Sequence, residues 1–239
     1  MKENCYYIQQ SDIYDDVILL PKDESMHLSK VLRQKEGERV KCFYDGSDYY
    51  DCVILSIDKN NAKLKIVGKS PCLGNPKKQI TLFQGLPKLD KLELVTQKLT
   101  ELGIAEITPF YSKFCIAKDN PKKNERLMKI SVSACKQCGR TRVIKINKTI
   151  DLFDIDLSPF DLVLFANEKE EVSNLNNFNK QIKNANSIAY IVGSEGGFCD
   201  DEIKFLATKS QSFSLGKRIL RTESASIAIG GYISFVGEN

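Results

Sequence analysis

The chain has 239 residues, of which 42% are hydrophobic and 28% charged, and its formal net charge is +4. This length allows one large or two modest domains, and the composition is typical of a soluble globular protein. The longest uncharged stretch near the C-terminus, residues 224–237, is too short to cross a bilayer, and the first seven residues lack the apolar core of a signal peptide. We therefore expect a cytoplasmic protein.

Residues 5–70 have the pattern of a small β-rich module. Residues 24–34 predict one short helix ahead of the strands. Three β-type runs then follow one another, at 38–44, 49–55 and 62–67. Asp45-Gly46 separates the first two runs, which is a good signal for a hairpin. A linker at residues 71–76 ends the module, and a small sheet or barrel of this kind is more often a binding module than a catalyst.

From residue 79 onward, strand-like and helix-like segments alternate. The strand candidates are residues 79–84, 104–110, 162–166 and 187–192, and the helix candidates are residues 89–102, 125–137, 200–209 and a last segment from Thr222. This alternation predicts an α/β domain with a mostly parallel sheet that is covered on both faces. Neither the G-x-G-x-x-G nor the P-loop motif is present, which argues against the standard dinucleotide and P-loop sites.

Two glycine-bearing loops near the C-terminus are the best candidates for a ligand site. Gly-Ser-Glu-Gly-Gly-Phe at 193–198 follows one strand candidate, and Leu-Gly-Lys-Arg-Ile-Leu-Arg-Thr at 215–222 follows another short apolar run. Loops at neighbouring strand ends are where α/β sheets bind ligands, and glycine lets the backbone approach a flat ligand closely. The sequence argues against hydrolysis by a Ser-His-Asp triad, because the one histidine, His27, lies in the other module. An adenine-bearing cofactor held mainly by backbone groups fits better.

The eight cysteines do not form a recognisable metal or disulfide pattern. The close pair is Cys135 and Cys138, and a zinc site would need a second ligand pair. Because a C-x-x-C within a helix places both thiols on one face, we interpret them as packing thiols, with a redox pair as the alternative. We expect no metal site.

Positive charge is concentrated between Lys113 and Lys148. This segment has eleven lysine or arginine residues and two acidic residues, an excess of nine positive charges in a chain whose net charge is +4. Such a segment is typical of a nucleic-acid site, because phosphate contacts supply affinity without sequence information. A solvated helix face is the alternative interpretation.

The two loops, read with their flanks at 191–198 and 215–225, resemble the signature of SPOUT-class RNA methyltransferases. More narrowly, the chain resembles the bacterial 16S ribosomal RNA (uracil-N3) methyltransferase family, which it also matches at residues 27–54, 98–103 and 135–140. The resemblance implies an α/β fold with two domains. A small PUA-like β-barrel domain that binds RNA would occupy residues 1–72, and a SPOUT domain with a deep trefoil knot and a mostly parallel sheet would occupy residues 73–239.

The resemblance also implies a reaction, the methylation of uridine N3 in 16S rRNA with S-adenosylmethionine as cofactor. The expected partners are 16S rRNA in an assembled small subunit, with naked rRNA as an alternative, and a second copy of the chain in a homodimer. No membrane or metal partner is expected. The alternatives are a SPOUT methyltransferase that acts on another RNA position, and a binding protein that keeps the RNA surface without turnover.

The site residues are likewise implied by the resemblance. The cofactor-binding residues would be Phe165, Ala166, Asn167, Gly193, Glu195, Gly196, Gly197, Leu215, Gly216, Ile219, Leu220 and Thr222. The RNA-binding residues would be Lys30, Arg33, Lys136, Arg140 and Arg142. The catalytic candidates are Arg221 and Glu223, as a cation that stabilises the N3 anion or as a base, and Arg140, which would hold phosphate or the base from across the dimer. In the structural alternative, Glu223 interacts with the helix dipole and Arg221 forms a salt bridge to it.

Small residues recur along the last helix candidate. They are Ala225, Ser226, Ala228, Gly230 and Gly231. We expect them to let this helix pack closely, within the chain or against a second copy.

Overall fold

The computed structural model describes residues 3–58, 61–120 and 122–238, and these form two compact units. The first unit runs to Asn75 and also includes Cys135–Val143, and the second takes in Pro76–Ala134 and the chain from Ile144 onward. The predicted boundary at residue 72 differs from this division, because it assigns residues 135–143 to the second domain. Among the described helices, none is both long and apolar enough to cross a membrane.

The first unit is built on a mixed sheet with the strand order β1-β4-β5-β6-β3-β2. The described strands are β1 (Cys5–Tyr7), β2 (Ile13–Tyr14), β3 (Val17–Leu19), β4 (Arg39–Phe43), β5 (Tyr49–Ile57) and β6 (Ala62–Ser70). The pair β1–β4 is parallel and the other pairs are antiparallel. Along β5, the residues Tyr50, Cys52 and Ile54 are buried while their neighbours are not, as expected for a strand with one face on a core.

The hairpin predicted around Asp45-Gly46 is confirmed. Strand β4 pairs antiparallel with β5, and Gly46 in the turn has φ +75°. The predicted helix is shifted: α1 (Lys22–Met26) continues into the π-helical turn η2 (His27–Val31), and a short turn η1 (Gln10–Asp12) precedes them. The helical run ends before Arg33, whose φ of +52° lies in the left-handed region that a right-handed helix excludes.

The second unit contains a parallel sheet with the strand order β10-β8-β7-β12-β11-β13, to which β9 adds by pairing with β8. The described strands are β7 (Gln79–Gly85), β8 (Glu106–Tyr111), β9 (Lys145–Ile146), β10 (Ile150–Asp151), β11 (Leu162–Ala166), β12 (Ser187–Val192) and β13 (Gln211–Phe213). All of the described pairs in this sheet are parallel. The prediction of an α/β fold with a mostly parallel sheet is therefore confirmed.

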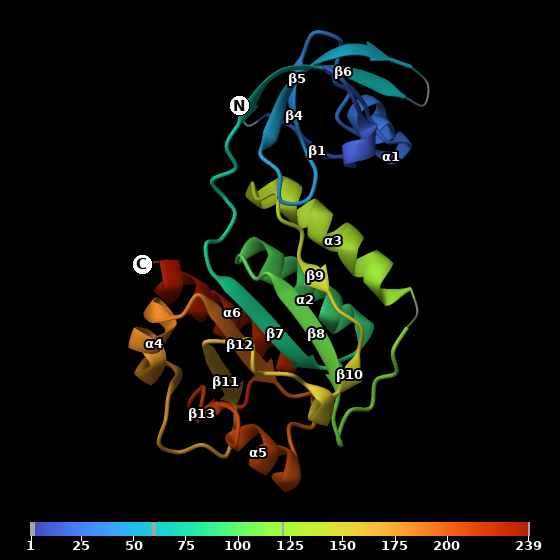
Figure 1. The fold of residues 1–239 in the computed structure, drawn as a ribbon. Helices are drawn as coiled ribbons and strands as arrows, with labels where there is room; N and C mark the ends of the chain where they lie inside the picture. The colour runs from blue at the N-terminus through green and yellow to red at the C-terminus, as the bar shows by residue number, and fades with distance from the viewer. Residues whose placement is uncertain (1–2, 59–60, 121, 239) are drawn as a thin grey trace. The chain divides into compact units, whose positions relative to one another are not determined.

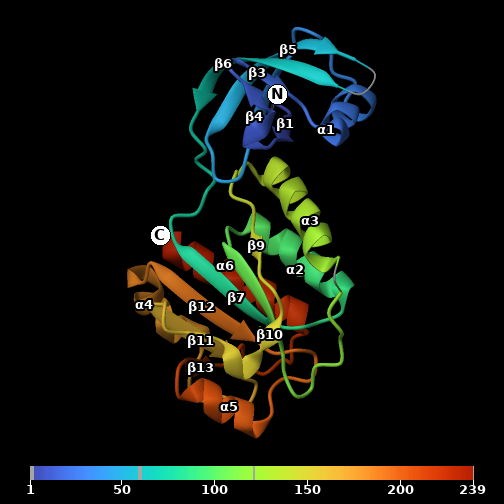
Figure 2. The ribbon, with the colours of Figure 1, turned by 45° about the vertical axis from the view of Figure 1, so that its right-hand side comes forward.

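Helices pack on both faces of this sheet (Figures 1 and 2). The helices are α2 (Leu89–Glu101), α3 (Lys123–Cys138), α4 (Asn179–Asn184), α5 (Asp200–Ala207) and α6 (Thr222–Glu238), with short turns η3 (Leu152–Asp154) and η4 (Leu175–Phe178). On one face, Leu99 of α2, Ile182 of α4 and Ile229 of α6 belong to a single hydrophobic cluster. On the other face, Leu206 of α5 packs in a second cluster with Phe165 of β11.

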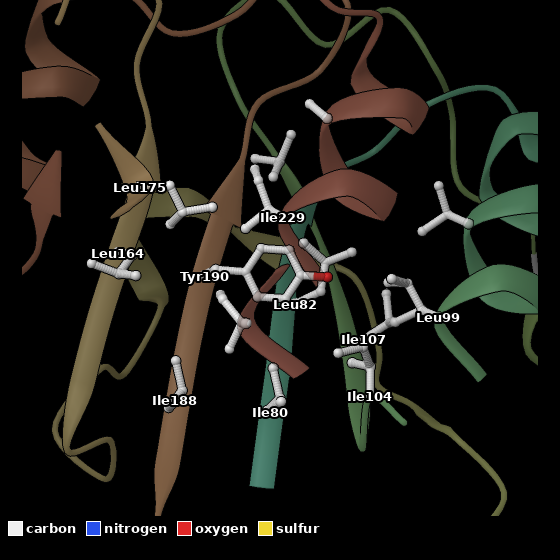
Figure 3. Close-up of a cluster of buried hydrophobic side chains, with 14 of the residues drawn as sticks. Ile80, Leu82, Leu99, Ile104, Ile107, Leu164, Leu175, Ile188, Tyr190 and Ile229 are labelled. Carbon is white, nitrogen blue, oxygen red and sulfur yellow. The ribbon is translucent and has the colours of Figure 1, made fainter. Parts of the chain in front are cut away.

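Tyr190 of β12 lies in the middle of the first cluster (Figure 3). Its hydroxyl donates to the carbonyl oxygen of Ser226 in α6 at 3.2 Å. A Cβ atom added at Gly230 would lie 2.6 Å from Tyr190 Oη and 2.7 Å from Leu99 Cδ2, distances that real side chains do not adopt. The close packing of the last helix that the small residues predict is therefore confirmed at Gly230, and it is packing within the chain.

Candidate functional site

A cavity of about 860 Å³ lies in the second unit, beside the segments that follow strands β11, β12 and β13. Most of its wall comes from residues 166–169 after β11, residues 192–198 after β12 and residues 214–225 after β13. The start of α2, the loop after β8 and Ile203 of α5 complete it. Ligand sites of open α/β sheets are found at the carboxyl ends of parallel strands. The two glycine-bearing loops that the sequence singles out therefore meet at one cavity.

Ten of the twelve predicted cofactor-binding residues line this cavity. They are Ala166, Asn167, Gly193, Glu195, Gly197, Leu215, Gly216, Ile219, Leu220 and Thr222. At Gly216 the backbone has φ +94°, with open space where a side chain would be. A residue with a Cβ would be strained in this conformation, so glycine is required for the turn rather than for packing.

Phe165 and Gly196 are placed elsewhere. Side chains alternate between the two faces of a strand, so Phe165 lies in the α5-side cluster, with its ring centroid 6.4 Å from that of Phe198. Gly196 packs against the loop after β8, because a Cβ there would lie 2.5 Å from Phe114 Cβ. Gly196 thus allows this loop, which supplies Ile116 and Ala117 to the cavity wall, to approach the glycine-bearing loop.

Gln84, which the sequence does not single out, connects three parts of the site. This side chain is fully buried at the end of β7, and its Nε2 donates to Thr222 Oγ1 at 2.9 Å. Thr222 Oγ1 in turn donates to the carbonyl oxygen of Gly193 at 2.6 Å, and Ser226 Oγ donates to Gln84 Oε1. The network therefore fixes the first turn of α6 to the glycine-bearing loop. The one signal in the sequence is a polar residue near the end of a mostly apolar strand candidate.

Glu202 of α5 holds the loop after β8 in place through hydrogen bonds. Its carboxylate is buried and accepts hydrogen bonds from the backbone nitrogens of Lys113 at 2.7 Å and Cys199 at 2.8 Å. The second bond caps the start of α5, as the acidic residues at 200–202 suggest, and the first holds the loop. Both loops at this edge of the cavity are therefore anchored by buried polar groups.

Cationic side chains outnumber carboxylates on the wall of the cavity. The cations on its wall are Lys88, Lys91, Lys169, Lys217, Arg218 and Arg221, and the carboxylates are Glu168, Glu195 and Glu223. Lys91 Nζ lies 2.7 Å from Glu223 Oε1, and the Glu223 side chain is 8% exposed. The hydrogen bond from Lys91 lowers the pKa of Glu223, although burial by itself would raise it. The ion-pair partner of Glu223 is thus Lys91, while Arg221 is exposed on the cavity wall.

We expect Glu223→Gln to reduce stability in a pH-dependent way. Because the folded-state pKa of Glu223 lies below its ordinary value of 4.5, the carboxylate stabilises the fold above that pH, and this contribution is lost as the pH falls through the folded-state pKa. At neutral pH the variant should lose about 2 kcal/mol of unfolding free energy, the usual size for a hydrogen bond to a charged group. Urea unfolding at a series of pH values measures this difference.

The control is Glu101→Gln in α2, which disrupts the pair between Lys98 and Glu101 at 3.0 Å. Since that pair is more exposed, the loss should stay below about 1 kcal/mol. A deficit of Glu223→Gln that is the same at acidic and neutral pH would contradict the assignment.

The predicted RNA-binding residues all belong to the first unit, whereas the cavity lies in the second. Lys30 and Arg33 are exposed and Arg142 is half-buried. Lys136 pairs with Glu24 at 2.9 Å. Arg140 is 1% exposed, and its burial lowers the pKa of its guanidinium.

The basic segment carries less uncompensated charge in space than along the sequence. Among the described residues, ion pairs join five of its cations to carboxylates, and these pairs are Lys123–Asp119, Arg126–Glu93, Lys129–Glu125, Lys136–Glu24 and Lys145–Glu106. Three of these carboxylates, Glu24, Glu93 and Glu106, come from outside the segment.

The eight cysteines are free thiols, and Cys135 and Cys138 both lie on α3. Within the part of the chain that the structure describes, no cluster of three or more histidine, cysteine, aspartate or glutamate side chains is arranged to hold a metal ion.

Comparison with known proteins identifies the family. Residues 74–234 match the family described as RNA methyltransferase domain, and residues 20–67 match the one described as RNA methyltransferase PUA domain. Ribosomal RNA small subunit methyltransferase E of Rickettsia conorii is 33% identical over 100% of this chain and 98% of its own length. The Bacillus subtilis protein of the same name is 28% identical over 90% of this chain and 89% of its own length.

The fold is also that of a relative with a solved structure. Ribosomal RNA small subunit methyltransferase E from Neisseria gonorrhoeae, bound to S-adenosyl methionine, superposes with a TM-score of 0.87 at 25% identity, and 98% of each chain is covered. The similarity thus extends over both units, and the cavity lies in the part that matches the methyltransferase domain. This chain belongs to the RNA methyltransferase family that includes ribosomal RNA small subunit methyltransferase E.

Proposed function

We propose that this protein methylates N3 of a uridine in the 16S rRNA of the small ribosomal subunit, with S-adenosylmethionine as the methyl donor. The observation that carries the proposal is the cavity formed by the two glycine-bearing loops. Relatives that align along the whole chain are named for small-subunit rRNA methylation, and one of them binds S-adenosyl methionine. The choice of uracil N3 follows from the sequence resemblance.

The residues of the cavity fit S-adenosylmethionine. A volume of about 860 Å³ is in the range of cofactor sites. The backbone at Gly193, Gly197 and Gly216 can hydrogen-bond the polar groups of the cofactor, and Ile219 and Leu220 offer apolar surface to its adenine ring. We propose that the ten predicted residues that line the cavity hold it, and that Gln84 keeps Thr222 and the loop at Gly193 in place.

Alignment and charge stabilisation are what the protein must add to the reaction. When bound, S-adenosylmethionine supplies a methyl group on a positively charged sulfur, and sulfur keeps the bonding electron pair when the methyl leaves. Uracil N3 must lose its proton to offer a lone pair, so a cation that stabilises the resulting anion accelerates transfer. We propose Arg221 for this role, since it is an exposed cation on the cavity wall.

The RNA would be bound by the first unit as well. We propose that residues 1–72 act as a PUA-like RNA-binding domain and residues 73–239 as a SPOUT domain. Lys30, Arg33 and Arg142 would be among the phosphate contacts. Burial of Arg140 argues for a structural role instead of the predicted phosphate contact. We further propose a cytoplasmic homodimer that acts on the assembled small subunit, as the resemblance implies.

The proposal is tested by incubating the protein with labelled S-adenosylmethionine and either small subunits or naked rRNA, followed by analysis of the labelled nucleoside. We expect 3-methyluridine from one of the two substrates. A different labelled nucleoside would contradict the assignment to N3. Cofactor binding without any product would favour an RNA-binding relative without turnover.

We expect Arg221→Ala to lower kcat about 100- to 1,000-fold, the usual loss when one stabilising donor is removed from a developing charge. The dissociation constant of S-adenosylmethionine, measured by calorimetry, should change little, since the side chain is exposed. Lys204→Ala is the control, because Lys204 is an exposed cation of α5 that does not line the cavity. Loss of folding in Arg221→Ala would instead assign Arg221 a structural role.

A further inference from the structure

The ion pair between Lys91 and Glu223 lies on the cavity wall at the junction of two helices. Lys91 is in the first turn of α2, just beyond the carboxyl end of β7, and Glu223 is in the first turn of α6. Both residues line the cavity. The Lys91 side chain is 30% exposed and that of Glu223 is 8% exposed, so the lysine is the more accessible partner. The lysine is therefore the part of the pair that a bound substrate can reach more readily.

Glu223 is poorly suited to act as the base for the N3 proton. A general base works best when its pKa lies near the pH at which the enzyme operates, and the hydrogen bond from Lys91 moves the pKa of Glu223 in the opposite direction, below 4.5. A carboxylate that is ionised, mostly buried and bonded to an ammonium group instead restricts where that group can go. Glu223 can thus place the Lys91 charge precisely.

We propose that Lys91, in addition to Arg221, is a catalytic residue that stabilises the uracil N3 anion through its ammonium group, and that Glu223 is the positioning residue that holds Lys91. In the step, the N3–H bond breaks, its electron pair stays on the ring and the proton passes to solvent water. The negative charge is shared by N3 and the carbonyl oxygens at C2 and C4, one of which would accept a hydrogen bond from Lys91 Nζ. N3 then bonds to the methyl carbon as the methyl–sulfur bond breaks. This inference rests on the proposed function.

Other charged side chains lie around the pair. Those that line the same cavity are Lys88, Glu168, Lys169, Glu195, Lys217, Arg218 and Arg221. Lys169 is paired with Asp200 at 2.7 Å, and Arg221 acts on the Glu223 carboxylate in the same direction as Lys91. Lys91 differs from the other cations on the wall in that a nearly buried carboxylate holds it in place.

The test compares Lys91→Met with the wild-type enzyme on the rRNA substrate that the wild type accepts. We expect kcat to fall about 100- to 1,000-fold, while the dissociation constant of S-adenosylmethionine stays within about threefold. The rise of kcat with pH should move to higher pH in the variant, because bound uracil then loses its proton without help from the cation. Lys91→Arg should restore part of the activity. Lys98→Met is the control, since Lys98 forms an ion pair with a glutamate of the same helix away from the cavity.

Two further measurements separate this role from a structural one. Substrate RNA made with 5-fluorouridine has a more acidic N3, so it should recover most of the lost rate of Lys91→Met while changing the wild-type rate little. In addition, Glu223→Gln should lower kcat in the wild-type background and have no further effect in the Lys91→Met background, because it acts only through Lys91. The double variant contains no uncompensated buried carboxylate, so it also controls for misfolding.

The outcomes distinguish the inference from the proposed function. If the wild type makes 3-methyluridine but Lys91→Met has an unchanged pH profile and no selective rescue by 5-fluorouridine, the inference is overturned and the proposed function stands. If the wild type methylates a different atom, both fail, since no N3 anion is then formed.

Discussion

Gln84→Leu is expected to weaken cofactor binding and to destabilise the fold together. Leucine has a similar volume but cannot donate to Thr222 or accept from Ser226, so the first turn of α6 loses its hydrogen bonds to β7 and keeps only the direct bond from Thr222 to Gly193. Losing the hydrogen bonds of a buried network should lower the free energy of unfolding by about 3 kcal/mol. The dissociation constant of S-adenosylmethionine should rise about tenfold or more, because the two loops of the cavity are then held together less firmly.

Calorimetric titration and urea unfolding measure the two effects. Gln79→Leu is the matched control, since Gln79 is the first residue of the same strand and its side chain is exposed. Both quantities should stay near their wild-type values in this control. If Gln84→Leu loses stability but binds the cofactor normally, then the network supports the fold alone and does not shape the cavity.

Tyr190→Ala is expected to cause the largest loss of stability. Tyr190 is fully buried in the cluster that α2 and α6 form on the sheet, so alanine would leave a large cavity between β12 and α6 (Figure 3). Truncation of a buried aromatic side chain typically costs about 4 kcal/mol. Tyr190→Phe should cost only about 1 kcal/mol, because it removes the hydrogen bond to Ser226 and keeps the ring.

Urea unfolding followed by circular dichroism compares the two variants. Equal losses in Tyr190→Ala and Tyr190→Phe would mean that the hydroxyl, and not the ring, stabilises this region. A small loss in both would mean that α6 closes over the vacated space.

The longer elements could be predicted from the sequence because they are long enough to show the hydrophobic periodicity of a helix or a strand. The strand predicted at residues 162–166 coincides with β11, and the helix predicted at residues 89–102 is one residue longer than α2. The elements without a specific prediction are short, such as β9 and β10 with two residues each and α4 with six. Their conformation depends on neighbours from other parts of the chain, so local pattern alone does not reveal them.

The parts of the site that depend on backbone conformation could be predicted from the sequence. Glycines concentrated in two loops indicate that the backbone can approach a ligand closely there, and most of the residues in these loops line the cavity. Gln84 and Lys91 could not be predicted, because their functional partners lie 138 and 132 positions further along the chain. For the same reason, the sequence overstates the unpaired positive charge of residues 113–148, since several of the carboxylates that pair with its cations lie outside the segment.

The membership of residues 135–143 in the first unit has a consequence for the order of events during synthesis. The chain leaves this unit at residue 75, returns at residue 135 and leaves again at residue 143. Within the unit, Asn75 Oδ1 accepts from the backbone nitrogens of Thr141 and Arg142, and Asp45 Oδ1 accepts from that of Val143. Because the ribosome makes the chain from its N-terminus, the first unit cannot be completed until more than half of the protein has emerged. Neither unit can therefore be transplanted into another protein as one continuous piece of sequence.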